Sequence, residues 1–259
     1  MRSILFVPAK WKMLCKISSF NADSYIIDLE DSISINEKAN ALKDTEKYLS
    51  EYNCQNVFVR VDRDFLNEQL RVLHLYKFKG FVLPKFEYEE DFLEYINIFQ
   101  EKEVMALVET PIGVTNIKNI ATCRWVNSIA FGAEDFTSCI GMKNDVEYLN
   151  FAKSMIVIYA KAFNKKVYDT PSFVLDNFEL LKEEIQKTVD MGFDGKLSIN
   201  PKQIQIINDL FKCCDFDYIR NVIEKYEKSG EAVLKIDDKV YEKMHIAHFK
   251  RILKENQKV

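Results

Sequence analysis

The sequence predicts an α/β fold, a (β/α)8 or TIM barrel with a C-terminal helical extension. Eight short runs rich in β-branched residues alternate with longer amphipathic stretches, which is the order expected of successive βα units. Most of these runs are apolar throughout, as in parallel strands that are covered on both faces. The length of 259 residues also suits a single barrel. A doubly wound open sheet is the alternative that this pattern leaves open.

The predicted strands are short and are separated by segments of helical periodicity. They cover residues 4–8, 24–30, 57–61, 80–85, 103–109, 128–135, 166–171 and 195–199. Between them, apolar residues recur at spacings of three and four with charged residues on the opposite face, which predicts helices. The clearest helical segments are 37–52, 65–78, 88–100, 146–163, 176–191 and 202–211.

The pattern changes after Phe211 and divides the chain into two predicted domains. Residues 1–211 form the barrel, and residues 212–259 form a C-terminal extension that packs on the barrel or on a neighbouring subunit. Within the extension the sequence predicts a helix over 217–228, a short strand over 231–236 and a helix over 241–255.

Prolines and polar residues gather at the carboxyl ends of the predicted strands. Proline cannot donate to a strand ladder, so it ends a central strand and stiffens the loop that follows. The prolines at or just after strand ends are Pro8, Pro84, Pro111, Pro171 and Pro201. The polar residues at the same ends are Asp28, Glu30, Asp31, Arg60, Lys85, Glu109, Glu134, Asp135, Asp169 and Asn200. In a barrel these ends converge on the face that carries the active site, which favours the barrel over the open sheet.

The composition argues against several classes of function. The formal net charge is -4 and no basic cluster is present, so nucleic-acid binding is not expected. The longest apolar runs are far too short to cross a bilayer, and the first residues lack the features of a signal peptide. The six cysteines form no CxxC pair, so we expect reduced, mostly buried thiols and a cytoplasmic protein.

Two carboxylates are the first candidates for chemistry. Glu109 and Asp135 close predicted strands that are one βα unit apart, and neighbouring strands lie roughly 4.8 Å apart. Two hard oxygen ligands with room for water and substrate oxygens suit Mg²⁺, with Mn²⁺ as an alternative. The competing interpretation is that both acids cap the helices that follow them. Glu134 is either a capping acid or an acid that supports the metal ligands.

Arg60 is the third candidate, because a guanidinium within an apolar strand needs an anionic partner. That partner is either a structural acid, Asp28 or Glu30, or the carboxylate or developing enolate of a substrate. Arg2 precedes the first strand and lies at the other end of the barrel if that strand starts at Ile4.

Eight strings of the sequence together resemble the citrate lyase β-subunit family within the HpcH/HpaI aldolase superfamily. They occur in family order, and the ordered set is far more specific than any single string. The strings are residues 2–8 (RSILFVP), 28–32 (DLEDS), 59–61 (VRV), 83–85 (LPK), 109–113 (ETPIG), 131–136 (FGAEDF), 192–196 (GFDGK) and 199–204 (INPKQI).

The resemblance implies Mg²⁺-dependent lyase or condensation chemistry at a carbon–carbon bond of small 2-oxo or 2-hydroxy acids, commonly carried as acyl-CoA thioesters. It also implies a homo-oligomer, often a homotrimer, in which the C-terminal segment covers a neighbour's site. By family pattern Glu109 and Asp135 are the metal ligands, and Arg60 binds the substrate carboxylate or enolate oxygen. The other implied pocket residues are Arg2, Glu30, Asp31, Ala133 and Glu134.

Several segments depart from the family's usual pattern. The first loop reads AKWK over residues 9–12, Asp62 stands where an asparagine is usual, and Asn200 stands where a histidine is frequent. Near the end, residues 237–244 (DDKVYEKM) replace the usual tail motif. Glu242 then takes the place of the tail aspartate, as the acid that would move a proton in a neighbouring subunit's site.

Two hypotheses from different classes follow. The first is a Mg²⁺-dependent carbon–carbon lyase or aldolase, in which Arg60, Asp31 and Glu242 are the catalytic residues. The second is a catalytically silent barrel that acts as a metabolite-binding or assembly subunit, motivated by the altered first loop and tail motif. Retention of both presumed metal ligands and the arginine favours the enzyme, since a fold alone needs none of them.

Overall fold

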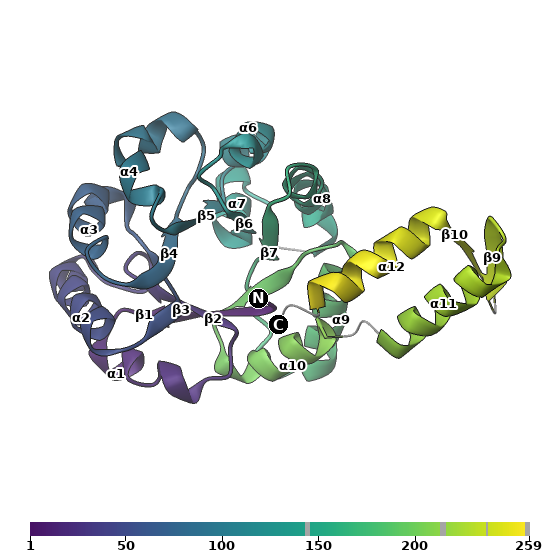
Figure 1. Ribbon diagram of the computed structural model, residues 1–259. Helices are drawn as coiled ribbons and strands as arrows, with labels where there is room; N and C mark the ends of the chain where they lie inside the picture. Colours follow the sequence, from purple (N-terminus) through teal and green to yellow (C-terminus); the bar gives the residue numbers. More distant parts are fainter. Residues whose placement is uncertain (143–145, 213–215, 237, 257–259) are drawn as a thin grey trace. The chain divides into compact units, whose positions relative to one another are not determined.

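The computed structural model describes residues 1–142, 146–212, 216–236 and 238–256 (Figure 1). The chain divides into two compact units, Met1–Phe211 and Lys212–Val259. In the described part of the chain, no helix combines the length and apolar character needed to span a membrane.

The first unit is a closed barrel of eight parallel strands in sequence order, so the predicted (β/α)8 barrel is confirmed and the open-sheet alternative is wrong. Figure 1 shows the strands at the centre and the helices around them. The strands are β1 (Ser3–Pro8), β2 (Ser24–Asp28), β3 (Cys54–Arg60), β4 (Phe78–Leu83), β5 (Glu103–Val108), β6 (Ser128–Phe131), β7 (Lys166–Asp169) and β8 (Gly195–Ser198).

Helices connect the strands around the outside of the barrel. The α-helices are α1 (Trp11–Leu14), α2 (Lys38–Glu51), α3 (Leu66–Leu73), α4 (Ile96–Phe99), α5 (Pro111–Thr115), α6 (Ile117–Thr122), α7 (Ala133–Ile140), α8 (Val146–Ala162), α9 (Phe178–Asp190) and α10 (Ile204–Leu210). The 3-10 helices are η1 (Ile17–Ser19), η2 (Ile35–Glu37), η3 (Arg63–Phe65), η4 (Glu89–Tyr95) and η5 (Pro201–Gln203).

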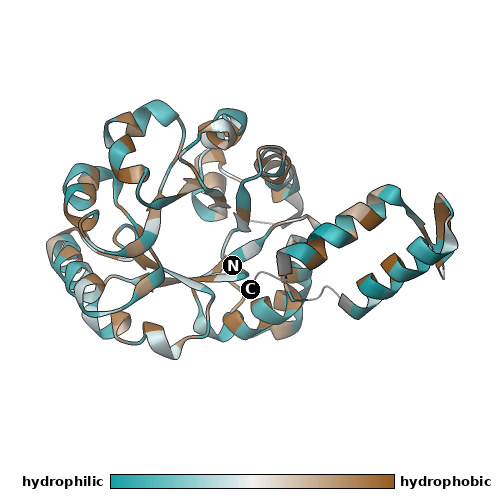
Figure 2. Ribbon diagram, viewed as in Figure 1, coloured by the Kyte–Doolittle hydropathy of each residue, from teal (hydrophilic) through white to brown (hydrophobic). Residues whose placement is uncertain are grey.

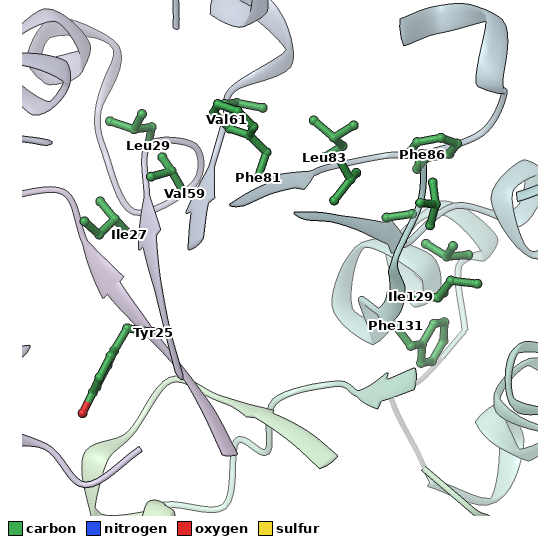
Figure 3. Close-up of a cluster of buried hydrophobic side chains, with 14 of the residues drawn as sticks. Tyr25, Ile27, Leu29, Val59, Val61, Phe81, Leu83, Phe86, Ile129 and Phe131 are labelled. Carbon is green, nitrogen blue, oxygen red and sulfur yellow. The ribbon is translucent and has the colours of Figure 1, made fainter. Parts of the chain in front are cut away.

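Two layers of apolar side chains hold the barrel, because successive residues of a strand face opposite sides of the sheet. One layer fills the barrel interior and includes Ile26, Phe58 and Met105. The other lies between the sheet and the helices and includes Ile27 and Val59 (Figure 3). The surrounding helices mix hydrophilic and hydrophobic residues (Figure 2), as amphipathic helices with one face on a sheet do.

Some predicted element boundaries are wrong. The predicted strand over 128–135 ends at Phe131, and α7 begins at Ala133. Glu134 and Asp135 therefore lie in the first turn of a helix, where the positive end of the helix dipole favours acidic side chains. Apolar periodicity carried the helix predicted over 65–78 too far, because Phe78 belongs to β4. The helix predicted over 88–100 is mostly the 3-10 helix η4.

The second unit contains α11 (Phe216–Ser229), β9 (Val233–Ile236), β10 (Lys239–Glu242) and α12 (Lys243–Asn256). The two strands pair antiparallel, and a small core that includes Val222, Ile236 and Tyr241 joins them to the helices. The extension is thus helical with a β-hairpin, and its last helix starts after the hairpin.

Cysteine exposure differs in part from the expectation. Cys54 and Cys123 are buried free thiols, but Cys15 and Cys139 are exposed. The prediction of buried thiols is therefore wrong for these two. Cys213 and Cys214, as well as Asp237 of the tail motif, lie outside the described residues.

Candidate active site

A pocket of about 390 Å³ opens at the carboxyl ends of the barrel strands. Strand ends of a parallel barrel point to one face, and the loops after them build the sites of this architecture. The lining residues are Phe6, Pro8, Asp28, Asp31, Ser32, Arg60, Leu107, Glu109, Phe131, Gly132, Ala133, Glu134, Asp135, Thr170, Pro171, Phe173, Leu197 and Ile199.

A buried ion pair between neighbouring strands forms one wall. Asp28 ends β2 and Arg60 ends β3, and the two residues are partners in the strand register. Arg60 Nε donates to Asp28 Oδ1 at 2.7 Å and Nη2 donates to Oδ2 at 2.8 Å. Burial disfavours the charged forms of both Asp28 and Arg60. The bidentate contact outweighs this effect, so the pKa of Asp28 is lowered and that of Arg60 is raised.

Two further acids approach the same guanidinium. Arg60 Nη1 lies 3.0 Å from Glu30 Oε2 and 2.9 Å from Asp31 Oδ2. Glu30 is buried, and burial together with the negative charge of Asp31 raises its pKa to about 7, against the opposing effect of Arg60. The Asp31 side chain is 58% exposed, so among these acids it is the one that a ligand can most easily displace from Arg60.

Glu109 follows β5 and is almost fully buried. The backbone N–H of Lys85 donates to its Oε1 at 2.8 Å, and Lys85 adopts a left-handed φ of 48°. A Cβ atom on Gly132 would lie 2.6 Å from Glu109 Oε2, so only glycine leaves room for this carboxylate. Burial, with the charges of Glu30 and Asp135, raises the pKa of Glu109 to about 8.

The start of α7 brings Asp135 to the same rim. β5 and β6 are paired up to Val108 and Phe131, so the residues that follow them emerge side by side. The first N–H of α7, from Ala133, donates to Thr170 Oγ1 at 3.1 Å. Thr170 thereby links the end of β7 to the helical turn that carries Glu134 and Asp135.

A largely buried charge network supports the backbone of Thr170. Lys196 Nζ, on β8, donates to the Thr170 carbonyl oxygen at 2.7 Å and to Asp169 Oδ2 at 3.1 Å. It also lies 2.9 Å from Glu184 Oε1, and Lys153 Nζ lies 3.0 Å from Asp169 Oδ1. Burial alone would raise the pKa of Asp169, but the positive charges of Lys196 and Lys153 outweigh this effect and lower it. The charges are therefore paired, as buried charges must be to be tolerated.

The donor set fits a hard divalent cation. Glu109 and Asp135 line one pocket and interact electrostatically. Among the described residues, no group of three or more His, Cys, Asp or Glu side chains is arranged to hold a metal ion. A two-carboxylate site leaves the remaining positions to water and substrate oxygens, which is how Mg²⁺ usually binds in enzymes.

The structure brings most of the predicted site residues together, with two exceptions. Arg2 does not line this pocket. It lies before β1, at the opposite end of the barrel, where its Nη2 pairs with Asp23 Oδ1 at 2.7 Å. The expected role of Arg2 in the pocket is therefore corrected. Glu242 ends β10 in the second unit, where its N–H donates to His245 Nδ1 at 3.0 Å.

Three polar residues that support the site were not assigned a role from the sequence. Lys85 follows a strand-end proline, which was a usable signal. Thr170 and Lys196 act through a backbone amide and a backbone carbonyl, and no spacing in the sequence reveals such partners.

The family model for HpcH/HpaI aldolase/citrate lyase matches residues 2–201. A (3S)-malyl-CoA thioesterase from Cereibacter sphaeroides is 27% identical over 97% of this chain and 93% of the relative. A citrate lyase subunit beta from Leuconostoc mesenteroides is 27% identical over 98% and 92%.

Among solved structures, the protein CitE from Mycobacterium tuberculosis in complex with magnesium, acetoacetate and coenzyme A superimposes with a TM-score of 0.84. It is 22% identical and covers 98% of this chain and 97% of its own. This likeness concerns the fold, whereas the family match also covers the strand-end residues of the pocket. The chain belongs to the HpcH/HpaI aldolase/citrate lyase family.

Proposed function

We propose that this protein is a Mg²⁺-dependent carbon–carbon lyase that cleaves a small 2-hydroxy acid carried as an acyl-CoA thioester. The products would be a 2-oxo acid and a shorter acyl-CoA, and the same site would catalyse the reverse condensation. The name of the malyl-CoA thioesterase supports a CoA-thioester substrate, and that of the citrate lyase subunit supports carbon–carbon cleavage.

The observation that carries the proposal is the meeting of two acids and one guanidinium at a single rim. Glu109 and Asp135 would hold the cation, and Arg60 lies in the same pocket. A Mg²⁺ ion there would supply Lewis-acid polarisation of the oxygen atoms of the hydroxy acid. Neither carboxylate is needed to stabilise a barrel, and burying Glu109 next to other acids costs stability.

Cleavage of the carbon–carbon bond needs a base, a proton donor and a positive charge, and different residues would supply them. A carboxylate base takes the hydroxyl proton, the C–O bond becomes a carbonyl, and the electrons of the C–C bond pass to the thioester fragment as an enolate. Arg60 supplies positive charge to offset the developing negative charge. The enolate carbon then takes a proton. We assign these proton transfers to Asp31, which is exposed in the pocket, and to Glu242 from another subunit of a homo-oligomer such as a homotrimer.

Glu109→Gln tests the proposal, with Glu103→Gln as the matched control. Both residues lie on or just after β5, but Glu103 begins the strand at the opposite end and is exposed. We expect Glu109→Gln to weaken Mg²⁺ binding by at least about tenfold and to lower turnover of malyl-CoA or citramalyl-CoA by about a hundredfold or more. Glu103→Gln should match the parent protein in both measurements.

Product analysis separates the alternatives. A 2-oxo acid with acetyl-CoA marks a lyase, whereas free CoA with the intact hydroxy acid marks a thioesterase. Binding without either product across the panel would support the catalytically silent barrel. Unchanged Mg²⁺ binding and turnover in Glu109→Gln would overturn the assignment of the metal site.

A further inference from the structure

The loop that follows β2 carries two of the acids that meet Arg60, so its position sets the geometry of that part of the site. Glu30 and Asp31 each place a carboxylate oxygen within 3.0 Å of Arg60 Nη1. Asp28 holds the loop from one side, because its two carboxylate oxygens accept the N–H groups of Glu30 at 3.0 Å and of Ser32 at 3.1 Å. The carbonyl groups of the same loop need donors of their own.

The ammonium group of Lys38 supplies donors to these carbonyl groups. Its Nζ donates to the carbonyl oxygen of Leu29 at 2.8 Å and to that of Glu30 at 2.5 Å, and it lies 2.5 Å from Asp62 Oδ2. An ammonium group has three donors, so each of them has an acceptor here. Lys38 is 8% exposed and Asp62 is 7% exposed, and a charge so deeply buried is tolerated only when it is paired in this way.

The helix that Lys38 begins does not favour a lysine at this position. Lys38 is the first residue of α2, where the positive end of the helix dipole lies. The dipole disfavours a positive charge there, so the contacts with the loop and with Asp62 must outweigh that effect.

Asp62 connects this lysine to the strand that carries Arg60. It lies two residues after Arg60, at the end of β3. Its N–H donates to Gln69 Oε1 at 2.8 Å, and its Oδ1 accepts the N–H of Asp64 at 2.9 Å. The asparagine that is usual at this position would keep an acceptor for Lys38 but not the opposite charge. The ion pair thus joins the loop after β2 to the end of β3.

We infer that Lys38 is a positioning residue of the active site, which holds the loop after β2 so that its two acids meet Arg60. Lys38 does not line the pocket, so it acts through the loop. The inference rests on the proposed function, because that function assigns a proton transfer to Asp31 and the developing negative charge to Arg60. Loss of Lys38 should therefore lower kcat, while the proposed metal ligands Glu109 and Asp135 keep their place.

Lys38→Met removes the three donors and keeps a side chain of similar length. We expect kcat for malyl-CoA or citramalyl-CoA to fall by about tenfold to a hundredfold, because a misplacement of about 1 Å can cost that much. Mg²⁺ affinity, measured by calorimetric titration, should stay close to that of the parent protein. Hydrogen–deuterium exchange followed by mass spectrometry should show faster exchange in residues 29–33, since the loop loses its donor.

Lys165→Met is the matched control. Lys165 is partly buried, and its Nζ donates to the carbonyl oxygens of Cys123 and Val126. It lies just before β7, at the opposite end of the barrel from the pocket. The same change there should lower the unfolding temperature and leave both kcat and the exchange of residues 29–33 unchanged.

The double variant Lys38→Met/Asp62→Asn separates a loss of position from a loss of stability. Lys38→Met alone leaves the Asp62 carboxylate buried without its cation, which costs stability, and the second change removes that charge. We expect the unfolding temperature to recover in the double variant while kcat stays low, because the loop carbonyl groups still lack their donor.

The outcomes separate this inference from the proposed function. If kcat of the double variant recovers together with the unfolding temperature, Lys38 has only a structural role. A parent-like kcat in Lys38→Met would overturn the inference and leave the lyase in place. Absence of turnover by the parent protein would instead overturn the proposed function, and the exchange of residues 29–33 in Lys38→Met would still decide whether Lys38 holds the loop.

Discussion

A carboxylate as deeply buried as Glu109 is tolerated only when its charge is offset or neutralised. The Lys85 N–H donates a hydrogen bond to it and the charge of Arg60 favours its ionised form, while burial and the negative charges of Glu30 and Asp135 oppose it. On the proposed assignment of Glu109 as a metal ligand, a proton and Mg²⁺ compete for the same carboxylate, which links Mg²⁺ binding to pH.

The first prediction concerns this linkage. The pKa of Glu109 is raised from 4.5 to about 8 by burial and by the nearby acids. Mg²⁺ must displace the proton below that pH, so its affinity should rise with pH by up to about tenfold per pH unit and level off above about pH 8. Calorimetric titrations with Mg²⁺ at several pH values measure this slope.

The stability of the metal-free protein should change in the opposite direction. A carboxyl whose pKa is raised in the folded state contributes stability below pH 4.5, and this contribution is lost as the pH rises towards about 8. Glu109→Gln should flatten both profiles. A Mg²⁺ affinity that does not vary between about pH 6 and pH 8 would rule out this competition.

At the scale of elements, the position of Asp135 depends on where α7 begins. The N-cap residue Gly132 makes no side-chain capping bond, and the Thr170 hydroxyl instead accepts the N–H of Ala133. Lys196 fixes the Thr170 backbone from β8. We propose that Thr170 is a positioning residue, because it ties the helical turn that carries Asp135, the second proposed metal ligand, to the buried network of β7 and β8.

Thr170→Val tests this link, because valine has nearly the same shape but accepts no hydrogen bond. We expect the unpaired Ala133 N–H to cost about 1–3 kcal/mol and Mg²⁺ affinity to fall by about tenfold as Asp135 loses its support. Thr170→Ser should restore most of the affinity. Mn²⁺ titration followed by electron paramagnetic resonance measures the metal site without turnover.

Thr45→Val is the control for loss of stability alone. Thr45 is buried in α2, and its hydroxyl donates to the Ala41 carbonyl oxygen at 2.8 Å. This variant should lower the unfolding temperature and keep metal affinity unchanged. If Thr170→Val binds Mn²⁺ like the parent protein, Thr170 has only a structural role.

The sequence predicts those helices and strands whose own residues carry a clear pattern, and it misses features that depend on distant residues. The apolar run 104–108 predicts β5, because a strand buried on both faces is recognised from its own residues and without knowledge of its neighbours. The sequence does not reveal the start of α7, because the apolar run 129–133 continues through Ala133 and the residue that accepts its first N–H, Thr170, lies far away in the chain. Arg2 is a different case, because the strand start at Ile4 predicts its place at the opposite end of the barrel, and only the family resemblance implies a place in the pocket. Its motif match carried no strand register, and the paired strands put it beside Asp23.

At the scale of the whole molecule, the proposed role of Glu242 links the second unit to a pocket that the barrel builds. The pocket is lined by barrel residues, and Glu242 lies in a different compact unit. A closed homo-oligomer can bring the extension of one subunit to the site of the next. The proposed role of Glu242 therefore requires a homo-oligomer in which the second unit of one subunit reaches the pocket of another.

Mixing two inactive variants tests whether Glu242 takes part in catalysis and whether it acts in a neighbouring subunit's pocket. We expect Glu242→Gln to bind Mg²⁺ like the parent protein and to lose turnover, while Glu109→Gln loses both. Each preparation alone is inactive, but subunits that are unfolded and reassembled together should regain activity, because some sites then pair an intact Glu109 with a neighbour's intact Glu242. In a random ring of equal amounts, about a quarter of the sites are restored.

The result discriminates between two arrangements of the chain. If Glu242 served the pocket of its own subunit, no mixed site would hold both acids and activity would stay at the level of the separate variants. Glu231→Gln, another exposed acid of the second unit, should be active throughout and controls for damage to the extension. Full turnover by Glu242→Gln alone would remove this residue from the mechanism, and with it the reason to expect that the extension completes a neighbour's site.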